Sequence, residues 1–202
     1  MKNLILALFL ISSTQLVYGQ SKKVRLLLEE IKSEWVVDDN NNVTYVKVIE
    51  VPSLNKAEIY NRALNYFVYN YNSGKSVIQT QDENLGRVVG KGFYNDVHIG
   101  QSILTTYIDC FHIVRVDARE GRARVVLSLT NYEKTLVGGD SGPTLISTDV
   151  NSEFPINPKG YSKTVMGKAF YKSHKSALQT LESIEKALKE GNTSIGIEND
   201  DW

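Results

Sequence analysis

The stretch "IDCFHIVRVDAREGRARVVLSL", Ile108 to Leu129, determines the fold. Two runs rich in β-branched residues flank Ala118-Arg119-Glu120-Gly121, so the stretch predicts a β-hairpin with a turn at those four residues. Pairing Asp117 with Arg122 places alternate residues of both strands on one apolar face, which is the predicted core side. This face carries Ile108, Cys110, His112, Val114, Val116, Ala123, Val125, Leu127 and Leu129.

The opposite face of the same hairpin interleaves aromatic and basic side chains. Its candidate binding residues are Tyr107, Phe111, Arg115, Arg122 and Arg124. Such a face suits stacking and phosphate contacts with nucleic acid. However, the chain carries 23 basic and 23 acidic residues, and a balanced surface exerts no long-range attraction on a polyanion. We therefore expect a protein, peptide or glycan partner and no nucleic acid.

A simpler interpretation of this face needs no ligand. The arginines on a half-exposed sheet face can pair with neighbouring carboxylates, and Asp109, Asp117 and Glu120 are close in the sequence. The sequence leaves both interpretations open.

Further strands are predicted on the N-terminal side of this hairpin. The turn residues 38–42 separate Trp35-Val36-Val37 from the β-branched run Val43–Val51, which indicates a second hairpin. Ser76–Gln81 and Arg87–Phe93 flank Asp82-Glu83-Asn84 and indicate a third.

Two longer helices and one short helix are expected. Asn55 and Glu58 have the spacing of a capping box, and Ile59, Ala63, Tyr66 and Phe67 follow as an apolar stripe. A last helix is predicted from His174 to Glu190, capped by Ser173. Helical spacing also recurs between residues 24 and 35.

The order β-α-β-β-β-β-α predicts an α+β fold, with an antiparallel meander sheet and helices packed on one face. The N-terminus reads as a secretory signal peptide: Lys2 precedes the apolar run Leu4–Ile11, and Val17-Tyr18-Gly19 offers a cleavage site before Gln20. This apolar run is too short to span a bilayer, so no membrane span is expected. The predicted organisation is residues 1–19 signal peptide, 20–131 sheet domain, 132–161 long loop, 162–191 C-terminal helix region and 192–202 polar tail.

Four segments in this order resemble a family of exported bacterial domains of unknown function with a TATA-binding-protein-like fold. They are Val48–Pro52, Glu58–Phe67, Val77–Asp82 together with Gly86–Gly92, and Gly121–Arg124, and the resemblance covers roughly residues 45–131. The family's usual tryptophan is replaced here by Tyr66. The resemblance implies a fold and export, and it implies no activity or catalytic residues.

One motif suggests an enzyme. Gly139-Asp140-Ser141-Gly142-Pro143 is similar to the nucleophile loop of trypsin-like proteases, but the following second glycine and the family's Ala-Ala-His-Cys motif are missing. The same residues are those that a turn requires, so we interpret the segment as a turn. Cys110 and His112 share a strand face, but two ligands make no metal site, and we expect both in the core.

These observations predict an exported protein, periplasmic or extracellular, that is not an enzyme and needs no cofactor or metal. The expected function is a binding or envelope-associated interaction module that uses the outer sheet face or the loop Leu136–Lys159. Two alternatives remain: a serine hydrolase that uses Ser141, and a structural subunit of a larger envelope assembly.

Overall fold

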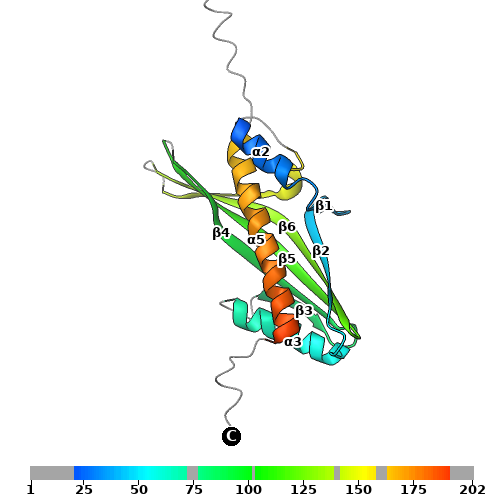
Figure 1. Ribbon diagram of the computed structural model, residues 1–202. Coiled ribbons are helices and arrows are strands. Elements are labelled where there is room, and N and C mark those ends of the chain that lie inside the picture. Colours follow the sequence, from blue (N-terminus) through cyan, green and yellow to red (C-terminus); the bar gives the residue numbers. More distant parts are fainter. Residues whose placement is uncertain (1–20, 72–76, 102, 139–141, 158–162, 192–202) are drawn as a thin grey trace, which may run out of the picture.

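The structure, a computed structural model, describes residues 21–71, 77–101, 103–138, 142–157 and 163–191 (Figure 1). The predicted signal peptide, the polar tail and Ser141 lie outside these ranges. No helix in the described ranges is long and apolar enough to cross a membrane. In chain order the elements are α2 (Lys22–Glu30), β1 (Val36–Val37), β2 (Val43–Glu50), α3 (Lys56–Asn70), β3 (Ile78–Asp82), β4 (Arg87–Gln101), β5 (Thr105–Arg119), β6 (Arg122–Val137), β7 (Thr144–Asp149), the 3₁₀ turn η2 (Val150–Ser152) and α5 (Lys163–Glu190).

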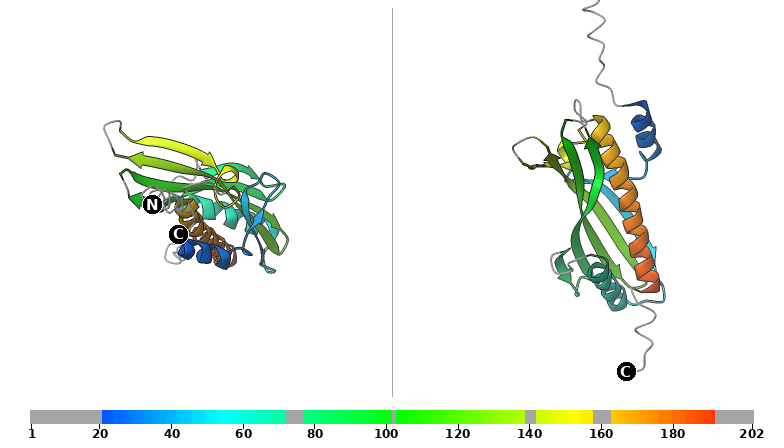
Figure 2. Two further views of the ribbon diagram at one scale, coloured as in Figure 1. Left: turned by 90° about the horizontal axis from the view of Figure 1, so that it is seen from above. Right: turned by 90° about the vertical axis from the view of Figure 1, so that its left-hand side faces the viewer.

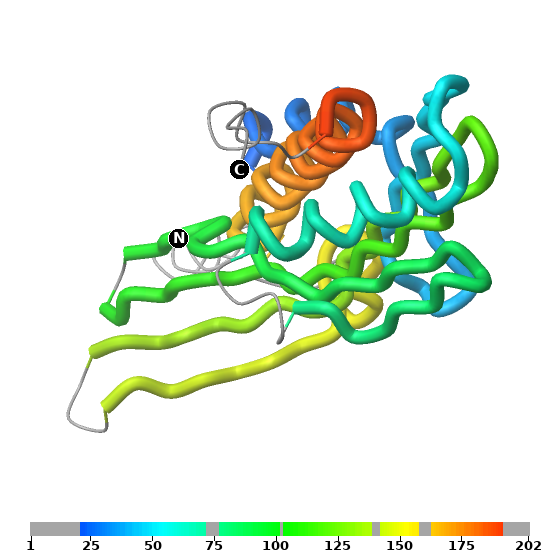
Figure 3. Tube along the Cα trace, turned by 90° about the horizontal axis from the view of Figure 1, so that it is seen from below, coloured from blue at the N-terminus to red at the C-terminus, as the bar shows by residue number. Residues whose placement is uncertain are grey.

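The sheet is antiparallel and has seven strands. Its order is β1-β2-β6-β5-β4-β3, and β7 pairs with the C-terminal part of β6, beyond the segment that pairs with β2. The strands from β3 to β6 form a continuous meander, because each pairs with the next in the chain. Both α3 and α5 cover the same face of the sheet, and no helix of the described ranges lies on the other face (Figure 3). The predicted α+β class, with helices on one face, is therefore confirmed.

The central hairpin has the predicted faces but a different register. Asp117 lies opposite Arg124, not Arg122, so the turn consists of Glu120 and Gly121 alone. Gly121 adopts a φ of 68°, which a glycine takes without steric cost and which makes this tight turn possible. A shift of two residues keeps every side chain on its face, so all nine predicted core residues are buried.

Helix α3 has the predicted cap and the predicted apolar stripe. The Asn55 side chain accepts a hydrogen bond from the Glu58 backbone N–H, and the Glu58 carboxylate accepts one from the Asn55 N–H. Ile59, Ala63 and Phe67 are buried against the inner face of the sheet. The hydrogen bonds begin the helix at Lys56, and the stripe fixes which side faces the core.

Helix α5 is longer than predicted and begins at Lys163. Ser173, the predicted cap, lies inside the helix, fully buried, and its hydroxyl donates to the carbonyl of Ala169 at 2.9 Å. Met166 and Phe170 continue the apolar stripe before Ser173, so packing extends the helix past a residue that can also serve as a cap. Helix α2 packs against the N-terminal half of α5 (Figure 2).

The predicted loop over residues 132–161 is wrong for most of its described part. Strand β6 continues to Val137, β7 pairs back onto it over Thr144–Asp149, and η2 follows. Strand β7 is mostly exposed on both faces: Leu145 and Ile146 are both exposed, although their side chains point in opposite directions. The alternation of apolar and polar residues that would reveal a strand in the sequence is therefore weak here.

Candidate functional site

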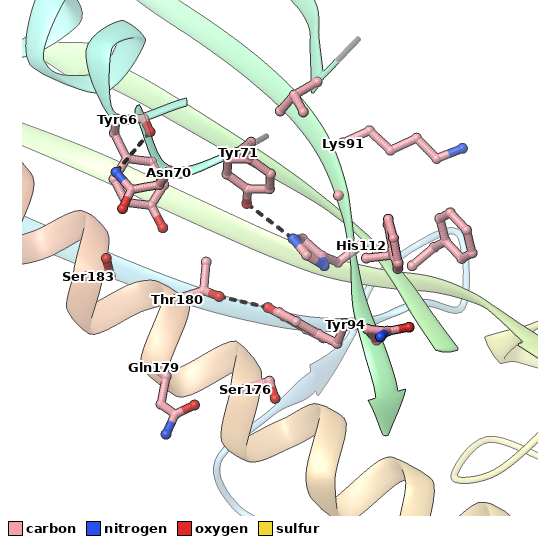
Figure 4. A pocket seen from close by; sticks show the side chains of 15 residues that line it. Tyr66, Asn70, Tyr71, Lys91, Tyr94, His112, Ser176, Gln179, Thr180 and Ser183 are labelled. Carbon is pink, nitrogen blue, oxygen red and sulfur yellow. Dashed lines mark hydrogen bonds between the residues drawn. The ribbon is translucent and has the colours of Figure 1, made fainter. Parts of the chain in front are cut away.

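A pocket lies at the edge of the sheet, where β4 passes α3 and α5. Its volume is about 770 Å³, within the range of small-molecule sites. The pocket is lined by Tyr66, Asn70, Tyr71, Val77, Lys91, Gly92, Phe93, Tyr94, Asn95, Phe111, His112, Ser176, Gln179, Thr180 and Ser183 (Figure 4).

Gly92 makes room for the floor of this pocket. A Cβ atom at this position would stand 2.5 Å from Cε1 of Tyr71 and 3.0 Å from Nε2 of His112. Any larger residue would therefore displace the two rings. The glycine lets Tyr71, at the end of α3, reach across β4 to His112 on β5.

Tyr71, Tyr94 and His112 form an aromatic cluster held by hydrogen bonds. The His112 ring stacks on Tyr94 with ring centroids 4.2 Å apart and an interplanar angle of 20°. The Tyr71 hydroxyl lies 3.3 Å from Nε2 of His112, and the Tyr94 hydroxyl lies 3.0 Å from Oγ1 of Thr180 on α5 (Figure 4). The cluster thus connects α3, the sheet and α5.

This cluster is uncharged at neutral pH. Burial lowers the pKa of His112 to about 4, because the charged imidazolium would lose its hydration. Burial also raises the pKa values of Tyr71 and Tyr94 well above that of free tyrosine. His112 Nδ1 is buried and has no hydrogen-bond partner in the described structure, so the floor retains one unused polar atom.

The outer wall of the pocket is aromatic with one positive charge. Phe93 and Phe111 stack with centroids 5.4 Å apart, and Lys91 Nζ lies 5.5 Å from the centre of the Phe111 ring. Lys91 is the only formally charged residue among the described lining residues. The pocket therefore combines aromatic surface, neutral hydrogen-bonding groups and one cation at its rim.

The five binding residues predicted from the sequence all lie on the uncovered sheet face, but they do not form one site. Phe111 belongs to the pocket wall, whereas Tyr107 lies eight residues from Arg115 on the same strand, which is about 26 Å in an extended strand. Arg122 lies opposite Glu50 and borders, with Arg124, a separate depression of about 150 Å³.

Arg115 and Arg124 converge on Asp117, together with Arg87 from β4. The distances from Asp117 are 3.2 Å to Arg115, 2.9 Å to Arg124 and 2.6 Å to Arg87. Burial acts to raise the pKa of Asp117, but hydrogen bonds from Arg87 and Arg124 outweigh it and hold this pKa below its ordinary value. For Asp117, the simpler interpretation of the face, arginines paired with a carboxylate, is confirmed.

Cys110 and His112 are both fully buried, as predicted. Cys110 lies in the core alone, whereas His112 also lines the pocket. Burial raises the pKa of the Cys110 thiol to about 12, which keeps it protonated. The position of His112 on the pocket floor was not predicted from the sequence. The glycine opposite it, Gly92, was the available signal, because a strand glycine can mark close approach by another side chain. In the described ranges no group of three or more His, Cys, Asp or Glu side chains could hold a metal ion.

Comparisons with known proteins support the resemblance seen in the sequence. Residues 45–132 match the family described as "Domain of unknown function (DUF4468) with TBP-like fold". A crystal structure of a DUF4468 family protein from Bacteroides ovatus superposes with a TM-score of 0.55 at 14% identity, over 77% of this chain and 91% of that one. A TBP-like protein from Parabacteroides distasonis gives a TM-score of 0.48 at 12% identity, over 74% and 96%. No curated protein matches the chain. The likeness in sequence and in fold confirms the expected TBP-like architecture.

Proposed function

We propose that this chain is an exported, non-enzymatic binding module and that its ligand occupies the pocket beside β4. The observation that carries the proposal is the aromatic cluster of Tyr71, Tyr94 and His112 on the pocket floor, in which Nδ1 of His112 has no hydrogen-bond partner among the described residues. A pocket with aromatic walls and a few convergent polar groups is the usual form of a ligand site.

The protonation states of the pocket favour binding over catalysis. A general acid or base works best when its pKa lies near the operating pH. The pKa of His112 lies at about 4, and those of Tyr71 and Tyr94 are raised well above neutrality. These groups therefore hold fixed protons at pH 7 and suit hydrogen bonding to a neutral ligand.

Export rests on the N-terminal sequence. Lys2, the apolar run that follows it and the small residues before Gln20 have the pattern of a cleaved secretory signal. If the protein is exported in this way, protein recovered from outside the cytoplasm should begin at Gln20, and its intact mass would show this.

The pocket is tested by filling it with a bulky side chain placed on α5. Exposed positions of this helix are used, because substitutions there disturb the fold least. Gln179 is exposed and lines the pocket, whereas Glu182 on the same helix is exposed and does not line it. We expect Gln179→Trp to abolish binding that the wild type and Glu182→Trp retain. The probes are a printed glycan array and a phage-displayed library of random dodecapeptides. If no probe of either class separates Gln179→Trp from Glu182→Trp, the proposal is wrong.

A further inference from the structure

We propose that the pocket receives an extended peptide, which pairs with the free edge of β4 as an additional strand. The proposal rests on the proposed function, because it names the chemical class of ligand for the same pocket. It follows from the backbone of β4 rather than from the side chains alone.

Strand β4 is much longer than the strand that pairs with its outer edge. The register of β3 against β4 runs from Asp82 opposite Arg87 to Ile78 opposite Gly90. From Lys91 onward, β4 pairs with β5 on one side and with no strand of the described chain on the other. Among the described residues, no strand pairs with its outward N–H and C=O groups, and such an edge can accept another strand.

The pocket follows this free edge. Five consecutive residues of β4, Lys91 to Asn95, line it, although alternate side chains of a strand point to opposite faces. The pocket thus borders the edge itself and both faces beside it. Four residues of α5 line the other side at helical spacing, Ser176, Gln179, Thr180 and Ser183 (Figure 4). A groove between an edge strand and a helix is a recurring site of peptide recognition by strand addition.

The available edge ends at Asp96. The Asp96 N–H donates to Oδ1 of Asp109 at 2.7 Å, and its carbonyl accepts from Nζ of Lys172 at 2.8 Å. Asp96 also has a φ of 49°, and the register of β4 against β5 shifts between Tyr94 and His98. This bulge interrupts the regular edge, so the paired part of the peptide opposes Lys91–Asn95 and is about five residues long.

The two faces beside the edge offer different surroundings to alternate peptide side chains. On the helix side, a side chain meets Tyr71, Tyr94 and His112, which suits an aromatic or aliphatic group. On the uncovered side, the next side chain lies over Phe93 and Phe111 near Lys91, which suits a carboxylate. We therefore expect a preference for apolar residues that alternate with an acidic residue.

A glycan fits the edge less well than a peptide. Sugar rings stack on aromatic side chains, but they cannot reproduce the repeating N–H and C=O pairs of a neighbouring strand. A peptide backbone supplies these pairs at the spacing that β4 requires. Main-chain bonding then gives affinity, and the two sets of side chains give the sequence preference.

The test is selection from the dodecapeptide library on the wild type, followed by synthesis of an enriched peptide with one backbone N-methyl group at each position in turn. N-methylation at every second residue of the paired part should weaken binding by about tenfold or more, because only alternate N–H groups face β4. N-methylation at the residues in between should change the affinity little. The variant Lys91→Glu should bind a peptide that carries Lys in place of the acidic residue more tightly than it binds the selected peptide.

Four outcomes would overturn the inference. The first is that N-methylation has the same effect at all positions of the paired part. The second is binding of the selected peptide that is unchanged in Gln179→Trp. The third is that the glycan array separates Gln179→Trp from Glu182→Trp while no peptide does; the proposed function then stands and strand addition fails. If neither probe separates the two variants, both proposals fail.

Discussion

Gly90 shows at the scale of one residue how tightly the helices fit the sheet. A Cβ atom at this position would lie 2.4 Å from Cε1 and 2.6 Å from Cδ1 of Phe67, a fully buried ring on α3. We predict that Gly90→Ala lowers the free energy of unfolding by about 1–3 kcal/mol, the usual cost of overpacking. Urea denaturation followed by circular dichroism would measure this change.

Gly100 on the same strand is the matched control for this prediction. The atom nearest to an added Cβ there lies 3.6 Å away, in ordinary van der Waals contact. Gly100→Ala should therefore change the free energy of unfolding by no more than about 0.5 kcal/mol. An equal decrease in the free energy of unfolding of Gly90→Ala and Gly100→Ala would show that the close approach of Phe67 to Gly90 does not cause the loss.

The burial of a single residue was predictable from the sequence where the two-residue period of a strand determines it. Ile108, Cys110 and Val114 alternate with half-buried or exposed residues, so their burial follows from period two alone. The role of His112 in a pocket was not predictable in this way, because the pocket needs Tyr71 and Thr180, which lie 41 and 68 positions away in the chain. Only the packing of α3 and α5 on the sheet brings these residues together.

At the scale of elements, the capping box of α3 makes a measurable prediction. Asn55→Ala removes the acceptor for the Glu58 N–H, so it should lower the free energy of unfolding by about 1 kcal/mol. Asn61→Ala, at an exposed position inside the same helix, should be neutral or slightly stabilising, since alanine is the better helix former. Thermal unfolding of the two variants and the wild type compares them. A larger loss in Asn61→Ala than in Asn55→Ala would contradict the assigned cap.

Elements were predictable where local signals agree with packing. The start of α3 was predicted because cap, box and apolar stripe coincide. The start of α5 was not, because Ser173 is a good cap by type but lies where Phe170 and Ala177 are buried on either side of it. Strand β7 was missed because Thr144–Asp149 is mostly exposed on both faces, and such a strand leaves no periodic signal.

At the scale of the whole molecule, we predict that stability falls on acidification below about pH 6.5. Burial lowers the pKa of all three histidines, and that of His112 to about 4. Between pH 6.5 and pH 4 the unfolded chain therefore binds more protons than the folded one, and the free energy of unfolding decreases as the pH falls. For His112 alone the loss should be on the order of 3 kcal/mol at pH 4.

The contribution of His112 is isolated with His112→Gln, which cannot titrate. Urea denaturation at pH 7 first establishes that the variant folds. Its free energy of unfolding should then decrease less than that of the wild type between pH 7 and pH 4. Identical pH dependence in the two proteins would show that folding does not lower the pKa of His112.

The position of α5 has a consequence for the order in which the molecule forms. This helix of 28 residues, about 42 Å long, covers the inner face of the sheet, and Arg62 of α3 donates to the carbonyls of Leu188 and Lys189 near its end. During synthesis, all seven strands leave the ribosome before α5 does. The sheet therefore has an apolar face that only α3 covers until then, and the molecule completes its core only after its last helix has been translated.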